Sequence, residues 1–242
     1  MTFIDAVQQG KHKFRNISED EIDCSGLDAD ALDLRGCTFR DVNFRSAQLN
    51  NLHAKNCTFI GCNFSFAHLN EAHFQDCSFY DYPSECSFYE ADCRNCHFID
   101  CDLRLASFER AQLFNSKFHK TNATGGSFVH ARFNDVAEIT DCNFRMVDLR
   151  DAQLKHCNLS KTIFEQADLR EANLSHCNLT ACDFAGAMTT HLKIEYADLR
   201  GANITAFDIR QLDFTGVTLY EEQRVMLTSN LGILYVKRDE SQ

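Results

Sequence analysis

Thirteen cysteines give this 242-residue chain its most obvious capacity for chemistry, because thiolates bind zinc and thiols form disulfides. Cys57 and Cys62, for example, look like a spaced pair. Their positions nevertheless follow a five-residue register, in which eleven of the thirteen occupy one recurring slot and Cys24 and Cys93 occupy another. Both slots otherwise hold apolar residues, which predicts reduced thiols that pack as small buried hydrophobes. We therefore expect neither a metal site nor structural disulfides.

The ten histidines are the next candidates, since imidazole serves as a general base and as a metal ligand. Nine of them fall at polar positions of the same register and are scattered along the chain. The chain matches no glycine-rich phosphate loop, no catalytic Cys–His motif and no clustered carboxylate motif. These residues predict no catalytic centre and no cofactor, so we expect a protein that is not an enzyme.

A five-residue period positions all of these side chains. From Cys142 to Leu219 every fifth residue is Phe, Leu or Ile, with Thr189 as the exception, and the residue two places earlier is mostly small. A period of five suits neither an α-helix at 3.6 nor a strand at 2, so the chain must turn at a fixed interval and return to the same environment. The pattern predicts a single solenoid in which two residues of each five point inward.

This unit resembles the pentapeptide-repeat family, whose repeat reads small, polar, Leu or Phe, polar, polar. The resemblance implies an all-β fold, a right-handed quadrilateral parallel β-helix in which four quintets form one coil of twenty residues. We expect residues 14–219 to form this β-helix, residues 1–13 to form an N-terminal cap and residues 220–242 to form a C-terminal segment.

The two ends of the chain depart from the period. Thr2 is an N-cap candidate before apolar residues at Phe3, Ile4 and Val7, which predicts a short capping helix that ends at Gly10. At the other end, residues 220–227 predict a helix with two glutamates in its first turn, and residues 231–236 predict a short apolar strand.

Large apolar residues in this C-terminal segment predict a homodimer. The expected contact residues are Val225, Met226, Leu227, Leu231, Ile233, Leu234 and Val236. A monomeric cap that packs these residues onto the last coil is the alternative.

The register is interrupted twice, and both interruptions are candidate partner-binding loops. Nine residues separate Phe79 from Phe88, around the only proline, and six separate Phe133 from Ile139 after a weak stretch at residues 121–126. The first candidate loop comprises Tyr80, Asp81, Tyr82, Pro83, Ser84 and Glu85. The second includes Thr121, Asn122, Thr124, Gly125, Asn134, Asp135 and Glu138.

The surface positions carry regular charge, with a net charge of −11. Six quintets contain an Asp-Leu-Arg or Asp-Ile-Arg triplet, and a coil of twenty would stack Asp148 near Asp168 and Asp151 near Glu171. We expect an acidic column formed by Asp148, Asp151, Asp168, Glu171, Asp198 and Asp208. Carboxylates at a fixed axial interval imitate the charge of a DNA duplex, although an ordinary acidic surface explains the same charge.

The C-terminal residues 208–233, including Gln223 and Leu227, resemble the end of the Qnr proteins, the quinolone-resistance branch of the family. The resemblance implies a DNA mimic that binds the type II topoisomerases DNA gyrase and topoisomerase IV, protects them from quinolones, dimerises through its C-terminal ends and uses two projecting loops. A scaffold for an unrelated protein and an immunity factor against a peptide antibiotic that poisons gyrase remain open. The N-terminus has no basic region followed by an apolar run, so we expect a cytoplasmic protein without a membrane or nucleic-acid partner.

Overall fold

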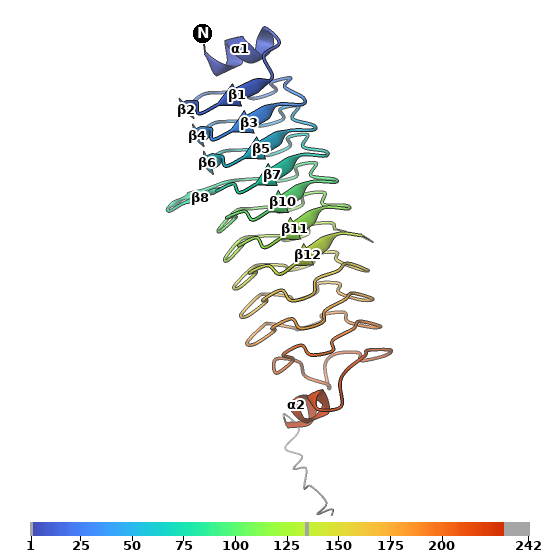
Figure 1. Cartoon of the computed structure of the whole chain (residues 1–242). Coiled ribbons are helices and arrows are strands. Elements are labelled where there is room, and N and C mark those ends of the chain that lie inside the picture. The colour runs from blue at the N-terminus through green and yellow to red at the C-terminus, as the bar shows by residue number, and fades with distance from the viewer. Residues whose placement is uncertain (1, 134–135, 230–242) are drawn as a thin grey trace, which may run out of the picture.

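The computed structural model describes residues 2–133 and 136–229 as a stack of square coils with a short helix near each end (Figure 1). Most strands lie in one parallel sheet with the order β1-β3-β5-β7-β10-β11-β12, and a second parallel sheet has the order β2-β4-β6. The strands of the first sheet are β1 (Lys13–Arg15), β3 (Asp33–Arg35), β5 (His53–Lys55), β7 (His73–Gln75), β10 (His97–Ile99), β11 (Lys117–His119) and β12 (Glu138–Thr140). Those of the second are β2 (Ser18–Asp20), β4 (Thr38–Arg40) and β6 (Thr58–Ile60).

The coil repeats every twenty residues, as the pentapeptide pattern implied. Phe14 pairs with Leu34 and Phe39 with Phe59, and single parallel bridges such as that of Asp148 with Asp168 continue the stacking beyond β12. Each side of the coil is too short to form more than a three-residue strand, which is why much of the stack consists of single bridges. The predicted parallel β-helix is confirmed.

The chain turns at the residue two places after each central residue, because this corner residue has a positive φ in most quintets. Non-glycine corner residues such as Asp151 and His130 have φ values of 57°, a conformation that costs an ordinary residue about 1–2 kcal/mol. The backbone offsets this cost with hydrogen bonds between coils, since the Asp151 N–H donates to Arg170 O at 3.2 Å and the His130 N–H donates to Arg150 O at 3.0 Å.

Asparagine and aspartate before the central residue reinforce the turn. The Asn43 side-chain oxygen accepts the backbone N–H of Arg45 at 3.1 Å, and Asn63 does the same for Ser65 at 2.9 Å. Such local side-chain bonds favour a turn over a continued strand. The polar residues on the outside of the coil therefore also stabilise its corners.

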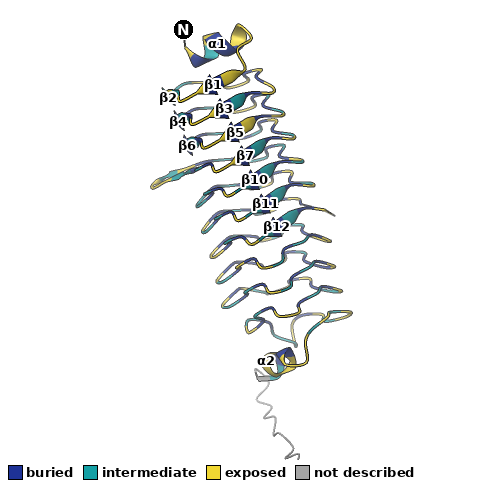
Figure 2. Cartoon of the chain, viewed as in Figure 1, coloured by how far each residue is buried: buried dark blue, intermediate teal, exposed yellow. Residues whose placement is uncertain are grey.

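Buried residues recur along every coil of the stack (Figure 2), and their side chains form one continuous axial core. Phe98 is fully buried, and its ring lies 5.0 Å from Phe74 in one neighbouring coil and 4.9 Å from Phe118 in the other. Rings on adjacent sides of one coil meet edge to face, as Phe59 and Phe64 do at 5.7 Å, and so do rings on opposite sides, as Phe88 and Phe98 do at 6.1 Å. Aromatic pairs with these geometries add to the stability gained from burial.

All thirteen cysteines are buried, as predicted, and none is in a disulfide. Most of their thiols donate to backbone carbonyls; Cys96 Sγ lies 2.9 Å from Leu69 O and Cys177 Sγ lies 2.9 Å from Leu154 O. Burial raises the pKa of the Cys142 thiol to about 12, so the reactive thiolate is scarce at neutral pH.

Helix α1 (Phe3–Gln8) covers the N-terminal end of the core. Thr2 Oγ1 accepts the Asp5 N–H at 3.1 Å, and the Asp5 carboxylate accepts the Thr2 N–H at 3.0 Å, which completes a capping box. The Phe3 ring packs 4.8 Å from that of Phe14 and 5.3 Å from that of Phe39. The predicted capping helix is confirmed.

Helix α2 (Gln223–Ser229) closes the opposite end. It begins later than predicted, so Glu221 and Glu222 precede it and do not lie in its first turn. The reason is the Gln223 side chain, which is drawn into the last coil by hydrogen bonds to its backbone. The predicted strand over residues 231–236 lies outside the described residues.

Candidate interaction surfaces

The described side chains form no site for metal chemistry. No group of three His, Cys, Asp or Glu residues among them is arranged to hold a metal ion. Within residues 2–133 and 136–229, no helix has the length and apolar character needed to cross a bilayer. The surfaces that remain are outward-facing side chains on the coils and one projecting loop.

The first interruption of the register is a β-hairpin of β8 (Tyr80–Asp81) and β9 (Ser84–Glu85), which extends beyond the edge of the stack (Figure 1). Thr58 pairs with Ser78, twenty residues on, whereas Asn63 pairs with Ser87, twenty-four residues on. Four residues are therefore inserted at one corner, and the nine-residue spacing is one quintet plus this insertion.

Side chains from two other coils hold the base of this hairpin. The Arg40 guanidinium pairs with the Asp81 carboxylate at 3.3 Å, and the Arg104 guanidinium stacks 3.9 Å above the Tyr80 ring. The turn contains a cis peptide bond between Tyr82 and Pro83, and Tyr82 is 75% exposed. The hairpin thus presents an aromatic side chain on an anchored base, a common feature of protein-binding surfaces.

The second interruption does not form the predicted projection over residues 121–126. Thr121 is buried, and its hydroxyl donates to Phe98 O at 2.9 Å. Asn122 bridges both Asp102 and Asn143 in the stack, and its Oδ1 accepts the Thr124 N–H at 3.1 Å, while Gly125 occupies an ordinary corner with φ 70°. Threonine fills the small inward slot as cysteine does elsewhere, so this stretch is regular coil.

The six-residue spacing between Phe133 and Ile139 has its counterpart in the strand register. Lys117 pairs with Glu138, twenty-one residues on, so one extra residue lies between Phe133 and Glu138. Glu138 lies in β12 and forms an ion pair with Lys117 at 3.3 Å. Asn134 and Asp135 lie outside the described residues.

The six predicted acidic residues do not form one column. Asp148 and Asp168 stack directly, but Met188 follows them in the same ladder. Asp198 lies in a different ladder, between Asn178 and Thr218. The sequence prediction was wrong here because a twenty-residue offset, and not membership of the same triplet, decides which side of the coil a residue occupies.

Each triplet aspartate is paired with its own arginine. The Asp168 carboxylate accepts Arg170 Nε at 2.9 Å and Nη2 at 2.6 Å, and Arg150 Nε lies 3.6 Å away. Asp148, Asp198 and Asp208 form the same two-point pairs with Arg150, Arg200 and Arg210, and an unpredicted pair joins Asp92 to Arg94 across Cys93. These pairs largely cancel the charge that an acidic column was expected to display.

These pairs predict a loss of stability in acid. The arginine hydrogen bonds lower the pKa values of Asp168 and Asp198, and that of Asp208 to about 2. Because the folded-state pKa lies below the unfolded value of about 4, the stabilisation is present above about pH 4 and is lost as the pH falls toward the folded pKa. We expect Asp168→Asn to lower the unfolding temperature at pH 7 but by much less at about pH 2. Glu171→Gln is the control, and an equal difference between Asp168→Asn and the parent protein at both pH values would contradict the prediction.

Carboxylates without an ion pair to any described side chain occur along the whole rod. In the first coils they are Glu19, Asp20, Glu21, Asp23, Asp28, Asp30 and Asp41; further along they include Glu71, Asp76, Glu85, Glu90, Asp100, Glu171, Asp183, Glu195 and Asp213. Asp151 lies at the corner below Glu171, and its carboxylate is 3.8 Å from His130 Nδ1. The uncompensated negative charge is therefore distributed along the rod, with one group of carboxylates in the first coils.

The predicted dimer contact is described only in part. Val225 is 49% exposed and Met226 is 37% exposed, whereas Leu227 is 7% exposed and packs beside Ile209 and Phe214 of the last coil. Leu231, Ile233, Leu234 and Val236 lie outside the described residues. The dimer stays a prediction, and sedimentation of the full chain at micromolar concentration tests it, because a monomer there would contradict it.

Comparison with known proteins identifies the repeat. Residues 57–81 and 148–186 match the family described as pentapeptide repeats, in eight copies, and residues 91–162 match the pentapeptide repeat region. No curated protein sequence matches the chain.

Solved structures share the fold over nearly the whole chain. A trypsin-treated form of QnrB1, described as a plasmid-mediated fluoroquinolone resistance protein, aligns with a TM-score of 0.73 and 22% identity over 93% of this chain and 100% of that one. A second trypsin-treated form aligns with a TM-score of 0.73 and 23% identity over 91% and 99% of the two chains, and full-length QnrB1 with a TM-score of 0.70 and 22% identity over 91% and 100%.

Proposed function

Because this chain belongs to the pentapeptide-repeat family, we propose that it is a binding protein for a type II topoisomerase, DNA gyrase or topoisomerase IV, and not an enzyme. The observation that carries the proposal is the alignment of 93% of this chain with all of a QnrB1 chain. The resemblance of the C-terminal residues to the Qnr proteins supports the same assignment.

We propose that the hairpin makes the main contact with the topoisomerase. Its position agrees with the smaller of the two loops that the Qnr resemblance implies, and its anchors at Arg40 and Arg104 hold an exposed Tyr82 away from the coils. Exposed aromatic side chains on a rigid base lose little conformational entropy on binding.

Charge supplies the second part of the proposed contact. The carboxylates of the first coils, together with Asp151 and Glu171, are not balanced by arginine and can face the basic DNA-binding surface of a topoisomerase. The Asp–Arg pairs contribute little to this attraction, so DNA mimicry would rest on these other residues. We propose that such binding protects the enzyme from quinolones.

The test is a gyrase supercoiling assay with and without ciprofloxacin. We expect the full chain to restore supercoiling in the presence of the drug. The sharpest variant deletes residues 81–84, because removing these four residues restores the twenty-residue coil. We expect the deletion variant to keep its circular dichroism and thermal unfolding but to lose most protection.

A matched substitution separates the hairpin from exposed tyrosines in general. Tyr82→Ala should weaken protection, whereas Tyr220→Ala, at a tyrosine that is 49% exposed near the opposite end, should not. No effect of the parent protein on gyrase or topoisomerase IV at micromolar concentration would refute the proposed function. Full protection by the deletion variant would refute the role of the hairpin.

A further inference from the structure

One side of the rod carries the opposite charge to the molecule as a whole. The outward positions of β1, β3, β5, β7, β10 and β11 are stacked in register by parallel pairing. They hold Lys13, Arg15, Asp33, Arg35, His53, Lys55, His73, Gln75, His97, Ile99, Lys117 and His119. We call these twelve residues the basic strand face; it has five Lys or Arg side chains, four histidines and one carboxylate, and β12, the next strand of the sheet, adds Glu138, which pairs with Lys117 at 3.3 Å.

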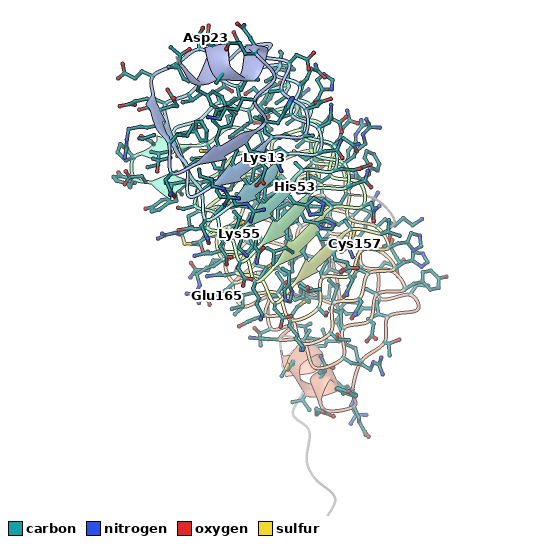
Figure 3. The ribbon with its side chains drawn as sticks, turned by 45° about the horizontal axis from the view of Figure 1, so that its top comes forward. Lys13, Asp23, His53, Lys55, Cys157 and Glu165 are labelled. Carbon is teal, nitrogen blue, oxygen red and sulfur yellow. The ribbon has the colours of Figure 1, made fainter. Side chains whose placement is uncertain are left out.

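Several of these cations have no anionic partner on the protein. Asp33 is paired with Arg35 at 2.9 Å and is thereby balanced. Lys13, Arg15 and Lys55 form no ion pair with a side chain in the described ranges, and Lys55 Nζ donates instead to Gln75 Oε1 at 3.2 Å. Figure 3 shows Lys13, His53 and Lys55 along the same run of strands. Positive charge is thus left unbalanced in a chain with a net charge of −11.

The centre of the face is a column of imidazoles. The rings of His53 and His73 lie 5.1 Å apart, and those of His73 and His97 lie 4.3 Å apart. A shallow hollow of about 200 Å³ lies between Asp33, Arg35, His53, Lys55, His73 and Gln75. Cationic and imidazole groups therefore border a recess that is open to solvent.

We propose that the basic strand face binds the phosphodiester backbone of nucleic acid. Arg15, Arg35 and Lys55 stack in successive coils, at the coil spacing of about 4.8 Å, and a linear polyanion with regularly spaced phosphates complements such a line. The carboxylates of a globular partner are not held at a regular axial interval, in contrast to those stacked along this repeat. The proposal goes beyond topoisomerase binding and replaces the expectation of no nucleic-acid partner.

Fluorescence anisotropy of the full chain with a fluorescein-labelled 20-nucleotide DNA, single-stranded or duplex, tests the proposal. We expect binding that weakens by roughly 20- to 40-fold from about 50 mM to about 200 mM salt, as for three neutralised phosphates. Lys13→Glu/Lys55→Glu should weaken binding by about tenfold or more at the lower salt concentration.

Lys155→Glu/Lys193→Glu is the matched control, because it makes the same change of net charge. Its lysines belong to a different ladder, that of Gln153, Asn173 and Lys193. We expect it to bind nearly as well as the parent protein. Equal losses in the two double variants, or no binding to either DNA, would overturn the proposal. If poly-glutamate displaced the labelled DNA as effectively as unlabelled DNA does, the proposal would also be overturned, and an acidic protein would be favoured as the partner.

The imidazole column gives the binding a pH dependence. Burial, and then the neighbouring His53, lower the pKa of His73; burial, followed by His73 and Lys117, lowers that of His97, while Glu71 and Glu138 act in the opposite sense. His73 and His97 are therefore neutral at pH 8 and gain a proton only below the ordinary imidazole pKa of about 6.5. We expect tighter DNA binding at about pH 5.5 than at about pH 8, and His73→Gln/His97→Gln should reduce this difference. Binding that does not strengthen on acidification would contradict a role for the column.

Discussion

Replacing Phe98 by alanine is expected to lower the free energy of unfolding by about 3–5 kcal/mol. The ring is fully buried and contacts the rings of Phe74 and Phe118 above and below it. Backbone hydrogen bonds on either side hold the coils at a fixed height; the His97 N–H donates to Ala72 O at 2.9 Å and the Lys117 N–H to Cys96 O at 2.8 Å. Since the coils cannot close onto the vacated space, most of the cavity would remain.

Denaturant-induced unfolding followed by circular dichroism measures this effect. Ile99→Ala is a close control, because Ile99 is the next residue, points outward and is only partly buried. We expect it to cost less than about 1 kcal/mol. A similarly small loss for Phe98→Ala would mean that the axial stacking does not dominate the stability of the rod.

Replacing Gln223 by alanine is expected to release helix α2 from the last coil. Gln223 is 2% exposed; its Nε2 donates to Leu199 O at 2.8 Å and to Ala202 O at 2.9 Å, and its Oε1 accepts the N–H groups of Gly201 at 3.1 Å and Tyr220 at 2.9 Å. Loss of the side chain leaves four backbone groups without these partners, and each unsatisfied buried group costs about 1–3 kcal/mol.

Hydrogen exchange resolves this local effect better than global unfolding does. We expect the amides of residues 223–229 to exchange at least tenfold faster in Gln223→Ala, while those around Phe98 stay unchanged. Gln211→Ala is the control, because Gln211 is exposed and its side chain bonds only to Asp208, at 3.3 Å. Unchanged protection of the helix in Gln223→Ala would show that apolar contacts such as that of Leu227 hold it alone.

Much of the fold could be predicted from the chain because the inward and outward positions depend only on the local period. Patterns a few residues long predict that the thirteen thiols and central residues such as Phe98 are buried, and that a capping helix begins after Thr2. The start of α2 could not be predicted this way, because Gln223 bonds to carbonyls more than twenty residues away. The regular coil at Thr121 was missed for a related reason, since its hydroxyl replaces a thiol against Phe98 O.

The sequence by itself determined which side chains line the axis and which meet solvent, since a five-residue repeat has the same inside wherever it occurs. Only the tertiary structure decided which outward side chains share a side of the rod. The side on which an outward residue lies depends on the number of residues in each coil. From the sequence alone, the nine residues from Phe79 to Phe88 could be two short quintets or one quintet with four inserted residues. Pairing of His73 with His97 selects the second count. It thereby places the basic strand face on one side and Asp198 apart from Asp148.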